Sequence, residues 1–434
     1  MRKRTAVSAV FVGFVLLAVA GAGFYTVSVD RDANARQQAL AGQVDPLTAD
    51  IDAAQQRLQD VPSDYTTWAQ LGAAYVDKAR ATGDPSYYDK ADAALQQSLT
   101  LQPEGNDAAL TGQGVLANSR HDFRAAAALA DRALAINAYS ATAWGVLTDA
   151  RIQLGDYPGA TEAVQRMLAL KPGIASFTRV SYDAELRGDL DMARSALEQA
   201  LESTSGAGEA FCRTYLGALA FSTGDLDEAD AQYAAGLEAV PGDPALLVGR
   251  ARVLAGRGEV TAAVETYQQV VAASPLPEYL IEFGEYLRSQ GRDDEAERQF
   301  AQVESVVARF AASGANEDLS MALFAADHGD PARALELAQA EYDRRQNIDS
   351  QDALAWALHV VGRDTEALPY AQQATSLGGV NALFLYHRGV IEAAVGEVEQ
   401  ARASLAQALD TNPYFSPLHA PRAQVLLESL GGRL

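Results

Sequence analysis

Cysteine and histidine are the residues of this chain best suited to nucleophilic, redox or metal chemistry, and both are scarce. The single cysteine, Cys212, allows neither an intramolecular disulfide nor a thiolate metal cluster. It lies between Phe211 and Arg213 in an apolar, helix-like stretch, which favours a packed side chain over a reactive thiol. The histidines are His121, His328, His359, His387 and His419, and none lies in an HExxH arrangement.

Two short polar strings invite a catalytic or metal-binding interpretation. In Asp327-His328-Gly329-Asp330 the Gly-Asp half recurs along the chain between helical segments, so a structural turn is favoured over metal binding. In Asp293-Asp294-Glu295 the carboxylates stand at a helix start, where they complement the helix dipole. We therefore expect no metal site and no catalytic acid/base pair.

Glycine motifs of nucleotide and hydrolase sites are absent from the sequence. Neither GxxxxGK[ST] nor GxSxG occurs, and Gly112-Gln113-Gly114 lacks the third glycine and the preceding strand of a dinucleotide site. The chain is therefore expected to hold no cofactor and to have no enzyme activity.

The charge of the chain excludes one class of partner. Its 434 residues carry a formal net charge of -23, and 48% of them are hydrophobic. An excess of carboxylates repels the phosphate backbone, so no nucleic acid is expected as a partner. The apolar content is ample for a large folded body.

The N-terminal residues 1–30 predict a contact with a membrane. Arg2-Lys3-Arg4 precedes an uncharged, largely apolar stretch from Thr5 to Ser28, long enough to cross a bilayer as a helix. The basic cluster should stay cytoplasmic, which places the rest of the chain outside the cytoplasm. Cleavage after Ala20 or Ala22 is the alternative and would give a secreted or periplasmic protein, but the apolar run is longer than most signal cores, which favours a retained single-pass anchor.

One pattern returns along nearly the whole chain. Its sharpest copy is Trp68-x-x-Leu71-Gly72-x-x-Tyr75, and every unit has an alanine in its second half. These alanines, spaced 33 to 38 residues apart, are Ala91, Ala126, Ala160, Ala193, Ala229, Ala263, Ala296, Ala334, Ala367 and Ala401.

Three further columns keep a fixed distance from the alanine. Five residues before it, a glycine predicts the left-handed end of a first helix in all but the first two units, at Gly155, Gly188, Gly224, Gly258, Gly291, Gly329, Gly362 and Gly396. Twelve residues after it, a proline stops the second helix, at Pro103, Pro172, Pro241, Pro275 and Pro413. A fourth column lies twelve residues before the alanine, or nineteen in the first unit, and holds small residues such as Gly72, Gly217 and Gly284, where we expect the two helices to touch.

From about Asp64 to Pro413 the chain resembles the tetratricopeptide repeat family. The resemblance implies an all-α fold, an α-solenoid wound as a right-handed superhelix of about ten helix-turn-helix repeats. Residues 31–63 are then a linker and a capping helix built on Leu47, Ile51, Ala54 and Leu58, and residues 414–434 form a C-terminal cap, in which Val425 to Leu430 close the array.

The resemblance also implies a protein or peptide partner held on the concave face that the first helices line. Candidate partner-binding residues in that register are Tyr182, Phe211, Phe221, Arg252, Arg288, Trp356, His359 and Tyr386, each with core packing as the alternative. The clamp that some members use for peptide C-termini is absent, because its positions hold Ala69, Ala73 and Val115. Two functions stay open: an envelope-associated scaffold or assembly factor, and a regulatory or substrate-presenting subunit of an envelope enzyme.

Overall fold

The computed structural model describes residues 46–433, and the regular elements in that range are α-helices. From the N-terminal side these are α2 (Pro46–Asp60), α3 (Tyr65–Thr82), α4 (Ser86–Leu101), α5 (Asp107–Ser119), α6 (Phe123–Ile136), α7 (Ala141–Leu154), α8 (Tyr157–Leu170), α9 (Ile174–Leu186), α10 (Leu190–Glu202), α11 (Ala207–Ser222) and α12 (Leu226–Ala239). They continue with α13 (Pro244–Gly256), α14 (Val260–Ala273), α15 (Pro277–Ser289), α16 (Asp293–Ala312), α17 (Asp318–His328), α18 (Pro331–Arg344), α19 (Ile348–Val360), α20 (Asp364–Ala374), α21 (Ala382–Ala394), α22 (Val398–Thr411) and α23 (His419–Ser429).

The predicted membrane segment, residues 1–30, lies outside the described residues, as do residues 31–45 of the predicted linker. Among the helices described, none combines the length and the apolar character that crossing a bilayer requires.

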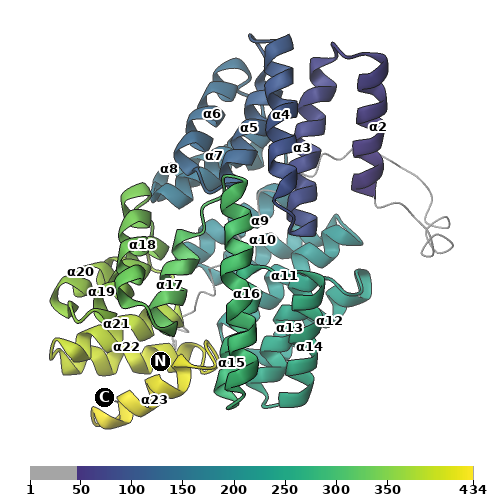
Figure 1. Cartoon of the computed structure of the whole chain (residues 1–434). Helices are drawn as coiled ribbons and strands as arrows, with labels where there is room; N and C mark the ends of the chain where they lie inside the picture. Colours follow the sequence, from purple (N-terminus) through teal and green to yellow (C-terminus); the bar gives the residue numbers. More distant parts are fainter. Residues whose placement is uncertain (1–45, 434) are drawn as a thin grey trace, which may run out of the picture.

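Helices α3 to α22 form ten successive hairpins, in which an odd-numbered first helix packs on the even-numbered second helix that follows it. Each hairpin packs in turn on the next, which gives the α-solenoid seen in Figure 1. The predicted all-α solenoid of about ten repeats is therefore confirmed.

The alanine column lies at the centre of every hairpin. All ten of its alanines have 0% of their surface exposed. The small residue on the facing helix leaves room for the large side chain one turn after the alanine: a Cβ added at Gly217 would lie 2.4 Å from the ring of Tyr233, and one at Gly284 would lie 2.3 Å from that of Phe300. Small residues thus set how closely the two helices approach.

The ends of the helices follow the predicted columns. The column glycines have positive φ, for example 81° at Gly155 and 75° at Gly188, where a Cβ would be strained. The aspartates that follow cap the second helices, as the Asp156 carboxylate does by accepting from the amide of Gly159. Each column proline stands just beyond its second helix, as Pro103 follows α4 and Pro413 follows α22.

In the two units without a column glycine, a different residue has the left-handed conformation at the turn. In the second hairpin, His121 occupies the column position and has a φ of 60°, a conformation that L-residues rarely adopt. In the first hairpin, α3 runs on to Thr82 and ends at Gly83, whose φ is 63°. The insertion after Gly83 therefore moves the left-handed residue without removing it.

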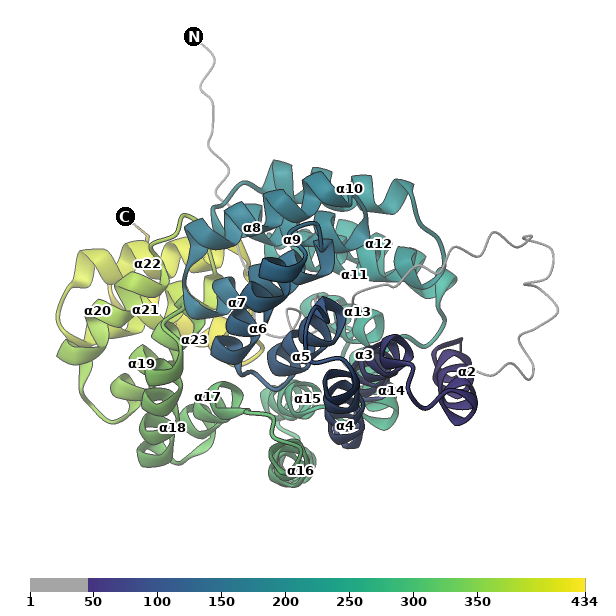
Figure 2. The ribbon, with the colours of Figure 1, turned by 90° about the horizontal axis from the view of Figure 1, so that it is seen from above.

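The array winds through more than one superhelical turn, so that residues about 190 positions apart meet. Figures 1 and 2 show the last hairpins returning to the side of hairpins from the first half. The pairing is regular, because the turn inside each early hairpin meets the loop after a late one. Asn412, after α22, donates to the carbonyl of Phe221 at 2.9 Å, 191 residues away. The amide of Ile348 donates to the hydroxyl of Tyr157 at 2.9 Å, also across 191 residues.

Single helices cover both ends of the described array. Helix α2 buries Ile51 and Leu58 against the first hairpin, with Leu47 and Ala54 packed beside them. Helix α23 buries Ala423 and Leu427 against the tenth.

The predicted closing segment from Val425 to Leu430 lies at the end of this helix, where Leu427 is buried and Leu426 and Leu430 pack beside it. Helix α23 begins earlier, at His419, and Val425 is 66% exposed because it points away from the tenth hairpin.

Candidate partner-binding site

A cavity of about 730 Å³ lies on the first helices of the middle hairpins. Its walls come from α11, α13, α15 and α17, from α21, and from the segment 413–424 that leads into α23. The superhelical turn brings this last segment to the middle of the array, so the cavity depends on the winding as well as on the hairpins.

Helix α15 supplies a stripe of three carboxylates to the cavity. Glu278, Glu282 and Glu285 are spaced i, i+4 and i+7, which places them on one face of the helix. Glu282 accepts two hydrogen bonds from the guanidinium of Arg252, at 2.7 and 2.6 Å, and one from the hydroxyl of Tyr267 at 2.7 Å. Such a bidentate pair is strong and fixes both side chains.

Glu285 is also held by a neighbour. Nε2 of His328 lies 3.0 Å from its carboxylate, and Nδ1 of His328 lies 2.9 Å from the guanidinium of Arg288. The arginine is a donor only, so Nδ1 accepts and Nε2 donates to Glu285. The neutral ring of His328 thus links Arg288 to Glu285, and it packs on Phe300 and Phe324. The buried side chain of His328 is thus a structural junction between α15 and α17.

Glu278 differs from its two neighbours on the stripe. No ion pair is found for it among the described residues, and the nearby Arg252 is engaged by Glu282. Burial raises the pKa of the Glu278 carboxyl to about 7, and the negative charge of Glu282 adds to the effect.

A cluster of histidines and aromatic rings forms the far wall. Nδ1 of His387 bonds the carboxylate of Asp352 at 2.9 Å, and Nε2 of His419 lies 3.3 Å from Asp327. Trp356 donates to Asp327 at 2.9 Å. Burial acts to raise the pKa of Asp327, but the hydrogen bonds and the charge of its partners outweigh it and hold the pKa below its usual value.

Two of the eight candidate residues, Phe221 and Arg252, line the cavity. Phe221, Trp356 and Tyr386 are at most 5% exposed and lie in the hydrophobic core, which favours the packing alternative for these three.

The remaining four candidates are partly buried beside neighbouring side chains. Phe211 stacks edge-on with Tyr215, and Tyr182 packs on the core around Phe384. His359 bonds Asp364 at 2.5 Å. Arg288, described above, lies over the ring of Phe300 as well as beside His328.

Sequence reasoning missed the acidic stripe and the segment 413–424. The i, i+4, i+7 spacing on α15 was readable, but the chain has 57 acidic residues and nothing marked these three. The segment 413–424 reaches the cavity through contacts across the superhelical turn, for which the repeat pattern has no signature.

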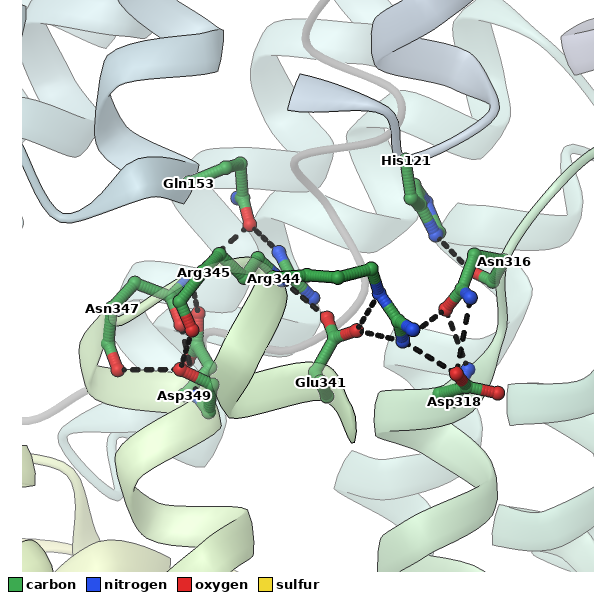
Figure 3. A network of polar contacts seen from close by, with 10 residues as sticks. His121, Gln153, Asn316, Asp318, Glu341, Arg344, Arg345, Asn347 and Asp349 are labelled. Carbon is green, nitrogen blue, oxygen red and sulfur yellow. Dashed lines mark hydrogen bonds and ion pairs between the residues drawn. The ribbon is translucent and has the colours of Figure 1, made fainter. Parts of the chain in front are cut away.

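A second set of polar side chains joins the superhelical turns, as Figure 3 shows. Arg345, at the end of α18, bonds Gln153 of the third hairpin and Glu341 of its own helix. Arg344 binds Asp318 at 2.5 Å and the side chain of Asn316 at 3.0 Å. Because Arg345 and Glu341 are both buried and bonded to each other, and Arg345 also bonds Gln153 of the third hairpin, this set holds the turns together.

Other reactive groups are structural where they are described. Cys212 is fully buried, and burial raises the pKa of its thiol to about 11. Within residues 46–433 no group of three histidine, cysteine or carboxylate side chains is placed to hold a metal ion.

Several solved structures resemble this chain. A tetratricopeptide repeat protein from Parabacteroides merdae is 19% identical, with 60% of this chain and 99% of that one covered and a TM-score of 0.35. The Cut9–Hcn1 hetero-tetramer of the APC/C is 11% identical, with coverages of 88% and 86% and a TM-score of 0.44. Yeast Tom70 is 12% identical, with coverages of 89% and 95% and a TM-score of 0.39. No curated protein matches the chain.

The repeats themselves match a known family. The tetratricopeptide repeat family model matches residues 111–173, 183–244, 214–276 and 248–313, which fall in the second to seventh hairpins. The first hairpin and the last three share the buried alanine column of those matched units. Such repeats generally mediate protein–protein interactions, and their fold is typically a non-catalytic scaffold. The hairpins within residues 111–173 and 183–313 are therefore tetratricopeptide repeats.

Proposed function

We propose that this chain is a scaffold or assembly factor that binds a protein or peptide partner on the inner face of its helical array. The observation that carries the proposal is the cavity of about 730 Å³ on α11, α13, α15 and α17. Its volume is in the range of specific ligand sites, and its walls combine aromatic rings with a few fixed charges. Such walls provide both the area and the orientation that a partner needs.

The proposal includes a location. The apolar stretch from Thr5 to Ser28 anchors the chain in a membrane, and the basic residues before it keep the repeats on the extracytoplasmic side. The intact mass of the mature protein tests the anchor, since a chain that begins after Ala20 or Ala22 would be free of the membrane. Protease digestion of intact cells tests the side, because extracytoplasmic repeats are degraded without lysis.

Site-specific photocrosslinking tests the binding face. A photoreactive benzoylphenylalanine replaces Gln290, an exposed residue at the rim of the cavity, in the full chain expressed in its own host. The matched control carries the same group at Gln199, an exposed residue of the second helix α10. We expect one discrete crosslinked protein from position 290 and none from position 199. Equal labelling at both positions, or none at position 290, would contradict the proposed binding face.

A further inference from the structure

The cavity is lined by more negative than positive charge. Glu278, Glu282, Glu285 and Asp327 contribute carboxylates, whereas Arg252 is the one Lys or Arg among the described lining residues. Its guanidinium is already bonded to Glu282. A ligand that carried further negative charge would be repelled, and a cation would be attracted.

Three buried polar atoms at the cavity have no hydrogen-bond partner. They are the hydroxyl of Tyr286, Nε2 of His387 and Nδ1 of His419, on side chains that are 2%, 1% and 3% exposed. His387 uses its other nitrogen on Asp352, and His419 uses its other nitrogen on Asp327. Each of these histidines therefore has one ring nitrogen beside a carboxylate and one without a partner.

The carboxylate of Glu278 is the acceptor at the cavity that lacks a cationic partner. It is only partly buried, and no ion pair is found for it among the described residues, since the nearby Arg252 binds Glu282. A positively charged N–H donor on a bound ligand would supply that partner. Ammonium and guanidinium groups are the donors that combine N–H groups with positive charge.

The aromatic rings of the walls fit the same chemistry. Tyr279, Phe324 and Phe415 line the cavity beside the acidic stripe. The face of an aromatic ring attracts an ammonium or guanidinium group, and it also packs against aliphatic side chains. The occupant must consequently bring apolar surface along with its positive charge, as an extended peptide with alternating basic and apolar residues does.

We propose that the cavity binds a basic segment of the partner protein, with a lysine or arginine side chain directed at Glu278. This inference rests on the proposed function and specifies the chemistry of the partner. The raised pKa of Glu278 is consistent with it, since burial without a paired cation is what raises it, and a bound cation would reverse the effect.

A direct binding measurement tests the charge preference. The probes are the synthetic peptide acetyl-Leu-Lys-Phe-Arg-Leu-Lys-Phe-amide, its counterpart with Glu at each basic position, and spermidine. Each is titrated by calorimetry into the full chain in detergent micelles, at low and at high salt. We expect the basic peptide to bind, its affinity to fall with added salt, and the acidic counterpart not to bind.

The variant Glu278→Gln isolates the proposed contact. It removes the charge of the side chain and keeps its shape. We expect it to lower the affinity for the basic peptide about tenfold, as the loss of a charge-assisted hydrogen bond does. Glu198→Gln, on an exposed position of α10, is the matched control and should leave the affinity unchanged. A circular dichroism melt of Glu278→Gln that is no lower than that of the parent chain excludes unfolding as the cause.

The other outcomes overturn the inference. These are equal binding of the two peptides, no binding of either, an unchanged affinity in Glu278→Gln, or spermidine binding that the basic peptide does not displace. Mass spectrometry of the protein crosslinked from position 290 separates this failure from that of the proposed function. If the crosslinked segment contains no lysine or arginine, the proposal of a basic partner segment is wrong but the proposed binding face stands. If no protein is crosslinked at all, the proposed function itself is wrong.

Discussion

Nδ1 of His121 lies 2.5 Å from the backbone carbonyl oxygen of Asn316, and this contact joins the second hairpin to the loop after the seventh. The ring of His121 is held there by a backbone in the left-handed region, with a φ of 60°. Burial lowers the pKa of His121, and the positive charge of Arg345 adds to the effect, so the ring is neutral and Nδ1 donates to the carbonyl. Where other hairpins have glycine, this one has a residue that bridges two superhelical turns.

His121 therefore has two separable contributions, and two substitutions divide them. His121→Gly loses the bridge but relieves the strained φ, whereas His121→Ala loses the bridge and keeps the strain. We expect both variants to unfold at a lower denaturant concentration than the parent chain. The free energy of unfolding of His121→Ala should be lower than that of His121→Gly by about 1 kcal/mol. Equal midpoints for the two variants would show that the backbone at this turn is unstrained.

The column glycines divide into two groups that the sequence does not distinguish. A Cβ at Gly155 would lie 2.6 Å from the carbonyl oxygen of Gln346, in the adjacent superhelical turn. Gly362 has a similar φ of 77° and no atom within 4 Å of its Cβ position. Alanine at either position strains φ, but only Gly155→Ala also pushes the two turns apart.

We accordingly expect Gly155→Ala to destabilise the chain by about 1–3 kcal/mol more than Gly362→Ala, measured by urea denaturation of the full chain. Gly362→Ala serves as the control for backbone strain. Equal losses would mean that the superhelical turns do not touch at this point in solution.

The repeat pattern predicted the hairpins well because the residues of each column make their contacts within one hairpin. An alanine at Ala229, a glycine at Gly217 and a proline at Pro241 each act through neighbours less than about one repeat away. Local periodicity records such contacts, so the fold class and the helix ends follow from it.

The winding of the array and the candidate site depend on contacts that no column records. His121 and Asn316 are 195 residues apart, and the segment 413–424 reaches the cavity from the far end of the chain. How far successive hairpins rotate is set by small differences in packing, and these accumulate along the array. Trp356 and Tyr386 have the first-helix positions expected of contact residues, yet side chains of the adjacent hairpins and of α23 bury them in the core.

Helical glycines give a further test of the hairpin geometry. A Cβ at Gly217 would meet the rigid ring of Tyr233 at 2.4 to 2.8 Å, whereas one at Gly145 would meet the flexible end of Met167 at 3.2 Å. Gly217→Ala should therefore lower the melting temperature, with a cost of about 1–3 kcal/mol from overpacking. Gly145→Ala should leave the melting temperature unchanged or raise it, because alanine favours the helix by about 1 kcal/mol. The opposite order in thermal melts would contradict the close packing of α11 on α12.

Glu185 makes the stability of the array depend on pH. Burial raises the pKa of this α9 carboxyl to about 8, against 4.5 for an unperturbed glutamate. Between these values the folded chain keeps a proton that the unfolded chain has lost, so the free energy of unfolding falls as the pH rises from about 5 to about 8.

The glutamine of Glu185→Gln carries no charge at any pH, so this variant should lose the part of the pH dependence of unfolding that Glu185 causes. We expect the variant to match the parent chain near pH 4 and to be more stable at pH 8.5, measured as the difference in urea midpoint across the range. Glu198→Gln, on an exposed position, controls for the general effect of net charge. A difference between Glu185→Gln and the parent chain that does not grow with pH would place the carboxyl in contact with water.

Trp356 is the candidate contact residue whose environment most clearly indicates packing. It is 5% exposed, its ring stacks on His387 at 4.1 Å, and its indole N–H donates to Asp327 at 2.9 Å. Trp356→Ala should therefore lower the free energy of unfolding by about 3–5 kcal/mol, as the removal of a buried large side chain does. Trp144→Ala is the matched control, because that indole is only partly buried and donates to the backbone carbonyl of Ala138, so its loss should cost less. If Trp356→Ala instead melts like the parent chain and fails to capture the partner crosslinked from position 290, then Trp356 is a contact residue and the wall of the cavity is more open than the packing of α19 on α21 implies.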